Sequence, residues 1–139
     1  GINGSAGHSH KGLQGDTTGD MYRLVTTQNY MAVTGACLMT KAELYAKHPL
    51  DEENFAVAYN DIDFCLKLYE DGYLNVFTPY SEAYHYESKS RGLDETDKPN
   101  PRYEREKKNF QDRWGKYFNY HDPYYNPHFT LLYENYGYK

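Results

Sequence analysis

Residues 60–72 constrain the fold more than any other stretch, because they combine helical periodicity with recognisable signals at both ends. Four apolar residues recur at intervals of three and four, which places them on one helix face: Ile62, Cys65, Leu66 and Tyr69. Asn60 is suited to cap the first turn, and Gly72 is suited to the left-handed residue that closes the last one. The stretch predicts a helix that packs one apolar face on the rest of the domain.

Two aspartates, Asp61 and Asp63, lie in the first turn of this predicted helix. Carboxylates are favoured there by the helix dipole alone, so their presence has a purely structural explanation. Successive helical residues are turned by about 100°, so the two side chains point apart and are poorly placed to chelate one ion. We interpret Asp63 as a helix cap and Asp61 as a carboxylate free to face a cleft.

Composition narrows the class of protein. The 139 residues are enough for one domain with a modest core. The net charge of −5 and the dispersed basic residues argue against a nucleic-acid partner. The 17 tyrosines suit surfaces that meet half-polar ligands such as sugars.

The location of the protein is indicated by two further features. No apolar run is long enough for a transmembrane segment. Cys37 and Cys65 are expected to be buried, reduced thiols, which favours a cytoplasmic location.

The residues before this helix predict a strand and a second, shorter helix. The apolar run 30–39 is typical of a buried strand. Within it, Gly35 and Ala36 would let another backbone or a ligand approach closely. Thr40 and Glu43 match a capping box for a helix over residues 41–47. The glycine-rich residues 1–20 are expected to form a loop or a short strand.

The residues after it predict two more strands and a long helix. Residues 74–78 and 82–88 have strand character, with His85 and Glu87 on one face of the second. The helix is expected over residues 102–118, with an apolar face: Tyr103, Phe110, Trp114 and Tyr117. Its alternating Arg, Lys and Glu residues are typical of a solvated face. Residues 119–139 are expected to form an extended aromatic tail that packs on other elements.

A few side chains are candidates for binding. A lone histidine is ordinarily just hydrogen-bonded, but His85 has Glu87 beside it and an acidic helix end predicted nearby, so a divalent ion is reasonable. Lys89 and Arg91 lie in a flexible basic loop that could close over a diphosphate. Composition alone explains them equally well as ordinary surface cations.

Several short motifs follow one another in an order that is similar to the C-terminal half of family 2 glycosyltransferases. They are residues 34–39 (TGACLM), 51–53 (DEE), 60–68 (NDIDFCLKL) and 72–73 (GY), followed by Pro79 and His85. Residues 86–92 (YESKSRG) and 122–127 (DPYYNP) resemble the bacterial, rhamnosyltransferase-like branch that builds cell-surface polysaccharides. Each motif is short, but the ordered set covers nearly the whole chain.

The resemblance implies an α/β fold: a partial GT-A-type sandwich in which residues 1–139 are a single, C-terminal, acceptor-side portion. A few strands of a mixed sheet and about three helices are expected. Such enzymes transfer a sugar from a nucleotide-diphosphate sugar to a saccharide hydroxyl, use Mg or Mn, and usually invert the anomeric centre.

The resemblance also implies roles for individual residues. Asp61 matches the general base, although Asn60 stands where the family more often has Glu. His85 matches the metal-ligand histidine. Residues Thr34, Gly35 and Ala36 match the segment that lines the acceptor side, and Asn60 is expected on that side as well. The basic loop with Lys89 and Arg91 would contact the diphosphate.

The family's N-terminal half, with its nucleotide-binding sheet and Asp-x-Asp metal motif, has no counterpart in this sequence. We therefore expect most metal ligands to lie in that missing half and the fragment to be inactive on its own. The fragment can self-associate through exposed apolar surface. The full-length enzyme is expected to be cytoplasmic, and whether it associates with a membrane stays open. The alternative is a non-catalytic, tyrosine-rich module that binds carbohydrate or assists assembly.

Overall fold

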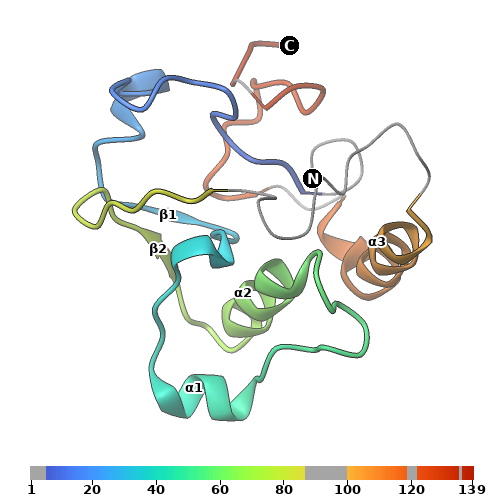
Figure 1. The fold of residues 1–139 in the computed structure, drawn as a ribbon. Coiled ribbons are helices and arrows are strands. Elements are labelled where there is room, and N and C mark those ends of the chain that lie inside the picture. The colour runs from blue at the N-terminus through green and yellow to red at the C-terminus, as the bar shows by residue number, and fades with distance from the viewer. Residues whose placement is uncertain (1–5, 87–99, 119–121, 135) are drawn as a thin grey trace.

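The computed structural model describes residues 6–86, 100–118, 122–134 and 136–139. The fold is mixed α/β, with three α-helices and one two-stranded sheet among the described residues (Figure 1). The helices are α1 (Ala42–Lys47), α2 (Asn60–Glu70) and α3 (Pro101–Trp114), and the strands are β1 (Gln28–Tyr30) and β2 (Asn75–Phe77). Short 3-10 turns are η2 (Asp20–Tyr22), η3 (Gly35–Cys37) and η4 (Gly115–Tyr117). The expected α/β class and number of helices are confirmed.

The sheet is antiparallel and joins segments that are far apart in the sequence. Gln28 pairs with Phe77 and Tyr30 with Asn75. The buried Asn75 side chain donates one hydrogen bond to the Met31 carbonyl oxygen (2.9 Å) and one to that of Cys65 (3.1 Å). The amide of Asn75 therefore ties the sheet to α2, and the strand predicted over residues 74–78 is confirmed.

The predicted buried strand over residues 30–39 is largely wrong. Strand β1 ends at Tyr30, and η3 takes the place of the expected strand centre. The Thr34 hydroxyl accepts a hydrogen bond from the Ala36 N–H (3.3 Å), a local turn that competes with extended pairing. As a result Cys37 is exposed, whereas Cys65 is buried as expected.

Two helix starts also differ from the prediction. Helix α1 begins after Lys41 without a side-chain cap, so the capping box of Thr40 and Glu43 does not form. Helix α2 begins at Asn60 itself, preceded by Tyr59 in the left-handed conformation (φ 66°). Of the strand predicted over residues 82–88, residues 82–86 are irregular, and the remainder lies outside the described residues.

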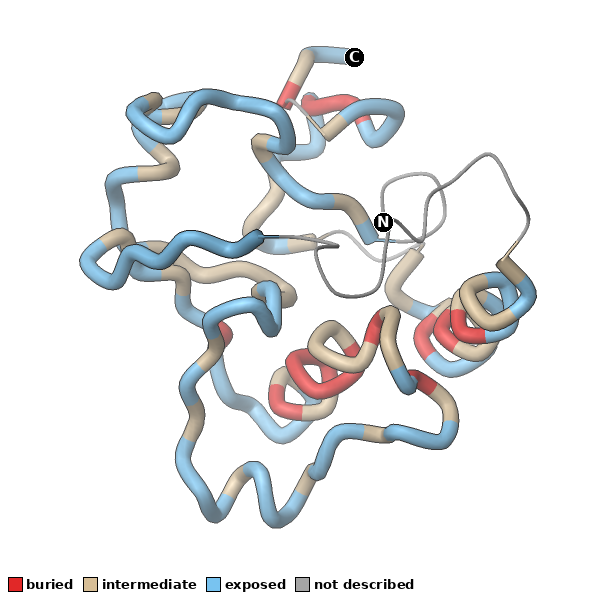
Figure 2. Tube along the Cα trace, in the orientation of Figure 1, coloured by how far each residue is buried: buried red, intermediate tan, exposed pale blue. Residues whose placement is uncertain are grey.

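The core lies between α2 and α3. Figure 2 shows the buried residues gathered on α2 and on the side of α3 nearest to it. Tyr59, at the start of α2, stacks on Phe110 of α3 with ring centroids 4.7 Å apart. The core cluster consists of Phe55, Tyr59, Leu66, Phe110 and Trp114. The helix predicted over residues 102–118 is confirmed as α3 followed by η4, with its apolar face inward.

The C-terminal residues pack on the N-terminal segment. The Tyr136 hydroxyl donates a hydrogen bond to the Ser9 hydroxyl (3.0 Å), and its ring lies 4.8 Å from the His10 ring. The His10 N–H donates to the Glu134 carbonyl oxygen (3.1 Å). Phe129 and Tyr138 form an isolated antiparallel bridge nearby. These contacts form a second, smaller cluster, apart from the α2–α3 core.

Candidate functional site

Asp61 lies in the first turn of α2 and faces η3. One carboxylate oxygen, Oδ2, accepts a hydrogen bond from the Gly35 N–H (2.7 Å), and Oδ1 accepts one from the Ile62 N–H (2.9 Å). The side chain is half-buried. An ionised carboxylate offers about four acceptor positions, so Asp61 keeps capacity for a further donor.

The turn at η3 allows this close approach because residue 35 is a glycine. A Cβ at Gly35 would lie 3.1 Å from the Asp61 Cβ, tighter than ordinary side-chain packing. Thr34, which caps the turn, and Ala36 flank the contact. Asn60 accepts a hydrogen bond from the Asp61 N–H through its own Oδ1 (2.7 Å). The structure thus brings together five of the candidate residues: Thr34, Gly35, Ala36, Asn60 and Asp61.

Asp63 is not a helix cap, contrary to the sequence interpretation. Its side chain is fully buried, and Oδ1 accepts hydrogen bonds from the Trp114 indole N–H (2.9 Å) and from Arg113 (2.8 Å). Oδ2 forms an ion pair with Lys67 (2.6 Å), one turn further along α2. The carboxylate points at α3 and not back at the helix end, so it joins the two helices across the core.

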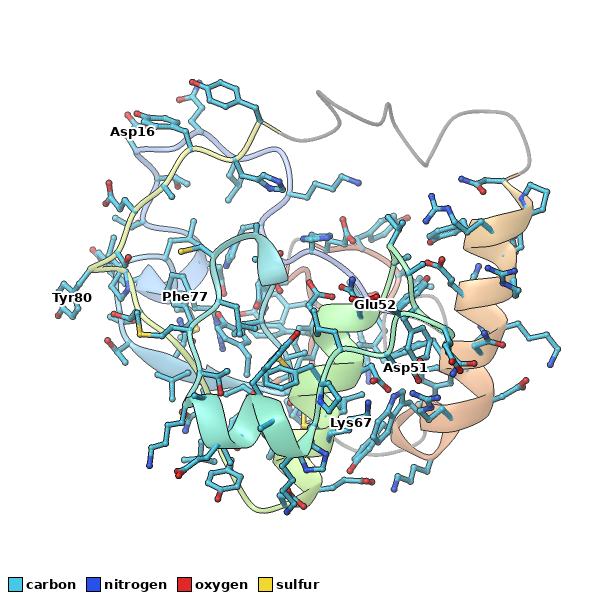
Figure 3. The ribbon with its side chains drawn as sticks, turned by 60° about the horizontal axis from the view of Figure 1, so that its bottom comes forward. Asp16, Asp51, Glu52, Lys67, Phe77 and Tyr80 are labelled. Carbon is cyan, nitrogen blue, oxygen red and sulfur yellow. The ribbon has the colours of Figure 1, made fainter. Side chains whose placement is uncertain are left out.

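Arg113 also reaches a second carboxylate, on the loop before α2. Its guanidinium pairs with Asp51 (2.8 Å) and lies over the Phe55 ring at 4.8 Å. Figure 3 shows Asp51 on the loop that connects α1 to α2, on the side that faces α3. Burial by itself would raise the pKa of Asp51, but hydrogen bonds from Asn54 and Arg113 outweigh it and lower the pKa to about 2. The loop is therefore fixed to α3 by an ionised pair.

Glu106 of α3 is a functional candidate that sequence reasoning missed, since the charged run around it was interpreted as solvated. Its side chain is fully buried, and Oε2 accepts a hydrogen bond from the Ala58 N–H (2.6 Å), just before the left-handed Tyr59. Glu106 lies three residues after Tyr103 and four before Phe110, on the apolar face of α3. That spacing is the signal that could have identified it. Glu106 and Asp63 together fix the start of α2, and so the position of Asp61.

The remaining candidates are not assembled around Asp61. His85 is exposed in an irregular segment, and Lys89 and Arg91 lie outside the described residues. Within the described ranges, no three His, Cys, Asp or Glu side chains come close enough to hold a metal ion. The described part of the chain therefore does not by itself fit a Mg or Mn centre.

Two surface hollows lie elsewhere. The larger, about 450 Å³, is lined by the last residue of α1, by the loop residues 48–53 that follow it and by Lys67. The smaller, about 250 Å³, lies between α1, α2 and residues 73–76. Asp61 lines neither of them. What the site around Asp61 offers chemically is a positioned carboxylate beside a glycine turn, an arrangement that can accept a proton from a hydroxyl.

Comparison with known proteins gives two similar sequences. The uncharacterized protein y4gI of Sinorhizobium fredii is 45% identical over 132 residues, which is 94% of this chain and 14% of that protein. The O-antigen biosynthesis protein RfbC of Myxococcus xanthus is 30% identical over 139 residues, which is 94% of this chain and 10% of that protein. The chain thus spans about a seventh of the length of y4gI and about a tenth of the length of RfbC.

No family model matches the chain. No solved structure matches it significantly either. Among the described residues, none of the helices has both the length and the apolar character needed to cross a bilayer. The similarity to RfbC relates the chain to a protein of O-antigen biosynthesis, a polysaccharide pathway.

Proposed function

We propose that the chain is the acceptor-side portion of an inverting, family 2 glycosyltransferase of GT-A fold that acts in cell-surface polysaccharide synthesis. The observation that carries the proposal is the hydrogen bond between Asp61 and Gly35 (2.7 Å). It joins the residue expected to be the general base to the turn expected to line the acceptor, across 26 positions of sequence. The similarity to RfbC supports the polysaccharide context.

The proposed chemistry is a single displacement. The acceptor hydroxyl oxygen forms a bond to the anomeric carbon of the donor sugar while the bond from that carbon to the diphosphate breaks. Asp61 accepts the hydroxyl proton, and the nucleoside diphosphate leaves with the electron pair. The Asn60 amide and the Gly35 N–H hold the Asp61 backbone and carboxylate in place.

The donor site and a Mg or Mn ion belong, in this proposal, mostly to polypeptide outside residues 1–139. His85 is proposed as one metal ligand, and Lys89 and Arg91 are proposed to contact the diphosphate. The described residues do not fit a metal centre on their own, so the role proposed for this chain in the displacement is that of Asp61 and the residues that hold it. On this proposal the isolated chain is inactive.

The test uses the longest polypeptide that the gene encodes around this chain, supplied with a panel of nucleotide-diphosphate sugars and Mn. Acceptor-dependent release of nucleoside diphosphate is the readout. Asp61→Asn should lower turnover by about 10²- to 10⁴-fold, the usual worth of a general base, while nucleotide binding stays unchanged. Asp112→Asn is the matched control, because Asp112 is an exposed carboxylate that forms an ion pair with exposed Lys108. Full turnover in Asp61→Asn would remove Asp61 from this role.

A second function, a non-catalytic carbohydrate-binding module, is favoured by one specific observation. Tyr80, Tyr84 and Tyr86 are all exposed along one short segment. Exposed tyrosine rings suit stacking against sugars. Binding of the isolated chain to a glycan array without nucleotide-sugar, lost in Tyr84→Ala, would support the module. Absence of such binding, together with activity of the longer polypeptide, would favour the enzyme.

A further inference from the structure

The N-terminal segment is held against the C-terminal residues by contacts of His10. Figure 1 shows this segment, in dark blue, beside the red C-terminal residues. The His10 N–H donates a hydrogen bond to the Glu134 carbonyl oxygen (3.1 Å), and the His10 and Tyr136 ring centroids are 4.8 Å apart. A Cβ at Gly19 would lie 3.2 Å from the His10 Cε1, tighter than ordinary packing, so a glycine permits this close approach. The ring is therefore enclosed by segments from both ends of the chain.

The environment of the His10 ring suits the neutral imidazole. Its Nε2 atom is buried and, among the residues that the structure describes, has no hydrogen-bond partner. A neutral imidazole has one ring nitrogen that carries no proton, and Nε2 can be that nitrogen. A protonated imidazole carries an N–H at both nitrogens, so it would leave a buried, charged donor without an acceptor. An unmade hydrogen bond costs more at a charged group than at a neutral one, so the closed contact disfavours the protonated ring.

The groups around the ring act on its charge in both directions. Burial has the largest effect and lowers the pKa of His10 from its ordinary 6.5, whereas Asp20 raises this pKa and Arg23 lowers it. The Arg23 guanidinium also lies over the Tyr136 ring, 4.8 Å from its centroid, so a protonated imidazole would share this neighbour with a second cation. The Glu134 carboxylate is already engaged by the backbone of the N-terminal segment. The net result is a lowered pKa.

The direction of the pH dependence follows from this lowered pKa. A histidine whose pKa is lowered in the folded state binds its proton more weakly in the closed contact than in an open one. The contact is therefore fully stabilised above pH 6.5, the ordinary pKa, and becomes weaker as the pH falls below that value.

We propose that His10 is a pH switch: the N-terminal segment stays in contact with Glu134 and Tyr136 while the imidazole is neutral, and separates from them when it is protonated. The separation is a local opening, because these contacts form a cluster apart from the α2–α3 core. Opening would allow the two ends of the chain to move apart. This proposal does not rest on sugar transfer, because it concerns only the contact between the ends of the chain.

An NMR titration of the isotope-labelled protein tests the proposal from about pH 7.5 to about pH 5.5, a range in which ordinary carboxylates remain ionised. The nuclear Overhauser contact between the His10 and Tyr136 rings should weaken along the titration curve of the His10 ring. The protection of the His10 amide from hydrogen exchange, corrected for the intrinsic rate, should fall with it, by at most about tenfold per pH unit because one proton is bound. The Asp63 amide, which donates to the Tyr59 carbonyl oxygen in the core (2.8 Å), should keep its protection. A ring contact and an amide protection that stay constant while His10 binds its proton would overturn the proposal.

Matched variants separate His10 from the other histidines. His10→Phe keeps a ring against Tyr136 but cannot bind a proton, so the protection of the amide at position 10 should no longer depend on pH. His128→Phe is the control, because His128 is an exposed histidine in the same C-terminal region, and it should keep the full pH dependence. Retained pH dependence in His10→Phe, or its loss in His128→Phe, would refute the role of His10. The titration of the unaltered protein decides the question even if the contact does not form in His10→Phe.

Discussion

The buried carboxylate of Asp63 should be the most sensitive polar position in the chain, and Asp63→Asn tests it with the smallest change of shape. The asparagine keeps an oxygen to accept the Trp114 indole N–H. It loses the ion pairs with Arg113 and Lys67, and its amide N–H₂ replaces an acceptor with a donor that faces a cation. The α2–α3 core loses its charge balance but keeps its packing.

The magnitude follows from how far the two cations can reach water. Removing one member of a fully buried ion pair costs about 3–5 kcal/mol. Here the Arg113 and Lys67 side chains are 33% and 24% exposed, so both can recover part of their hydration. We therefore expect a loss of about 2–3 kcal/mol in the free energy of unfolding. For a domain of this size that corresponds to a fall of about 10 °C in the melting temperature.

Urea unfolding followed by tryptophan fluorescence is the assay of choice, because Trp114 is the only tryptophan and its indole N–H contacts Asp63. With a typical urea dependence, the midpoint should fall by about 1 M. The control is Asp112→Asn, an exposed carboxylate on α3, and it should stay within about 0.5 kcal/mol of the unaltered protein. If the two variants lose the same free energy of unfolding, the link between α2 and α3 through Asp63 is refuted.

Three further predictions concern other contacts. The pKa of Asp51 is about 2, against an ordinary 3.8, so its contribution to the free energy of unfolding is complete above pH 3.8 and is lost as the pH falls towards 2. In Asp51→Asn, the fall in the free energy of unfolding between pH 5 and pH 2.5 should be smaller by about 1 kcal/mol, after allowance for solvent screening. An unchanged fall would contradict this. A thiol reagent at pH 8 should label exposed Cys37 at once. Cys65 should react only when the protein unfolds, because it is buried and burial raises its pKa to about 11. Rapid labelling of two thiols in the native protein would be inconsistent with the structure. Tyr136→Phe should cost about 0.5–1.5 kcal/mol in urea unfolding, because it removes a hydrogen bond, whereas Tyr138→Phe at an exposed ring should cost nothing measurable; equal effects would argue against the packing of the tail.

Local periodicity was sufficient to predict α2, α3 and β2. In the two helices the spacing of apolar side chains specifies both the element and its buried face, as Leu66 and Phe110 illustrate, whereas in β2 the buried side chain is the polar Asn75 and Val76 is exposed. The direction in which the Asp63 side chain points from α2 could not be predicted from such spacing. A first-turn aspartate is favoured by the helix dipole whether it caps or not, and its partners Arg113 and Trp114 lie about 50 residues further along the chain.

The candidate site, too, could be predicted from the sequence only in part. The residues of the η3 turn and Asp61 could be proposed from motif order, but the hydrogen bond from Gly35 depends on where α2 packs. The buried strand over residues 30–39 was predicted from apolar content, which does not reveal whether a neighbouring strand is present to pair with it. Glu106 was assigned to solvent because of its charged neighbours, although its spacing from Phe110 placed it inside.

The contact between the N-terminal segment and the tail has a consequence for how such a domain is carried in a longer protein. The His8 N–H donates to the Glu134 carboxylate (2.8 Å) across 126 positions of sequence, so almost the entire chain forms one closed loop. A polypeptide that passes through this domain would enter and leave at neighbouring points. The domain can therefore be accommodated as an insertion, and flanking segments on either side of it would remain close enough to pack against each other.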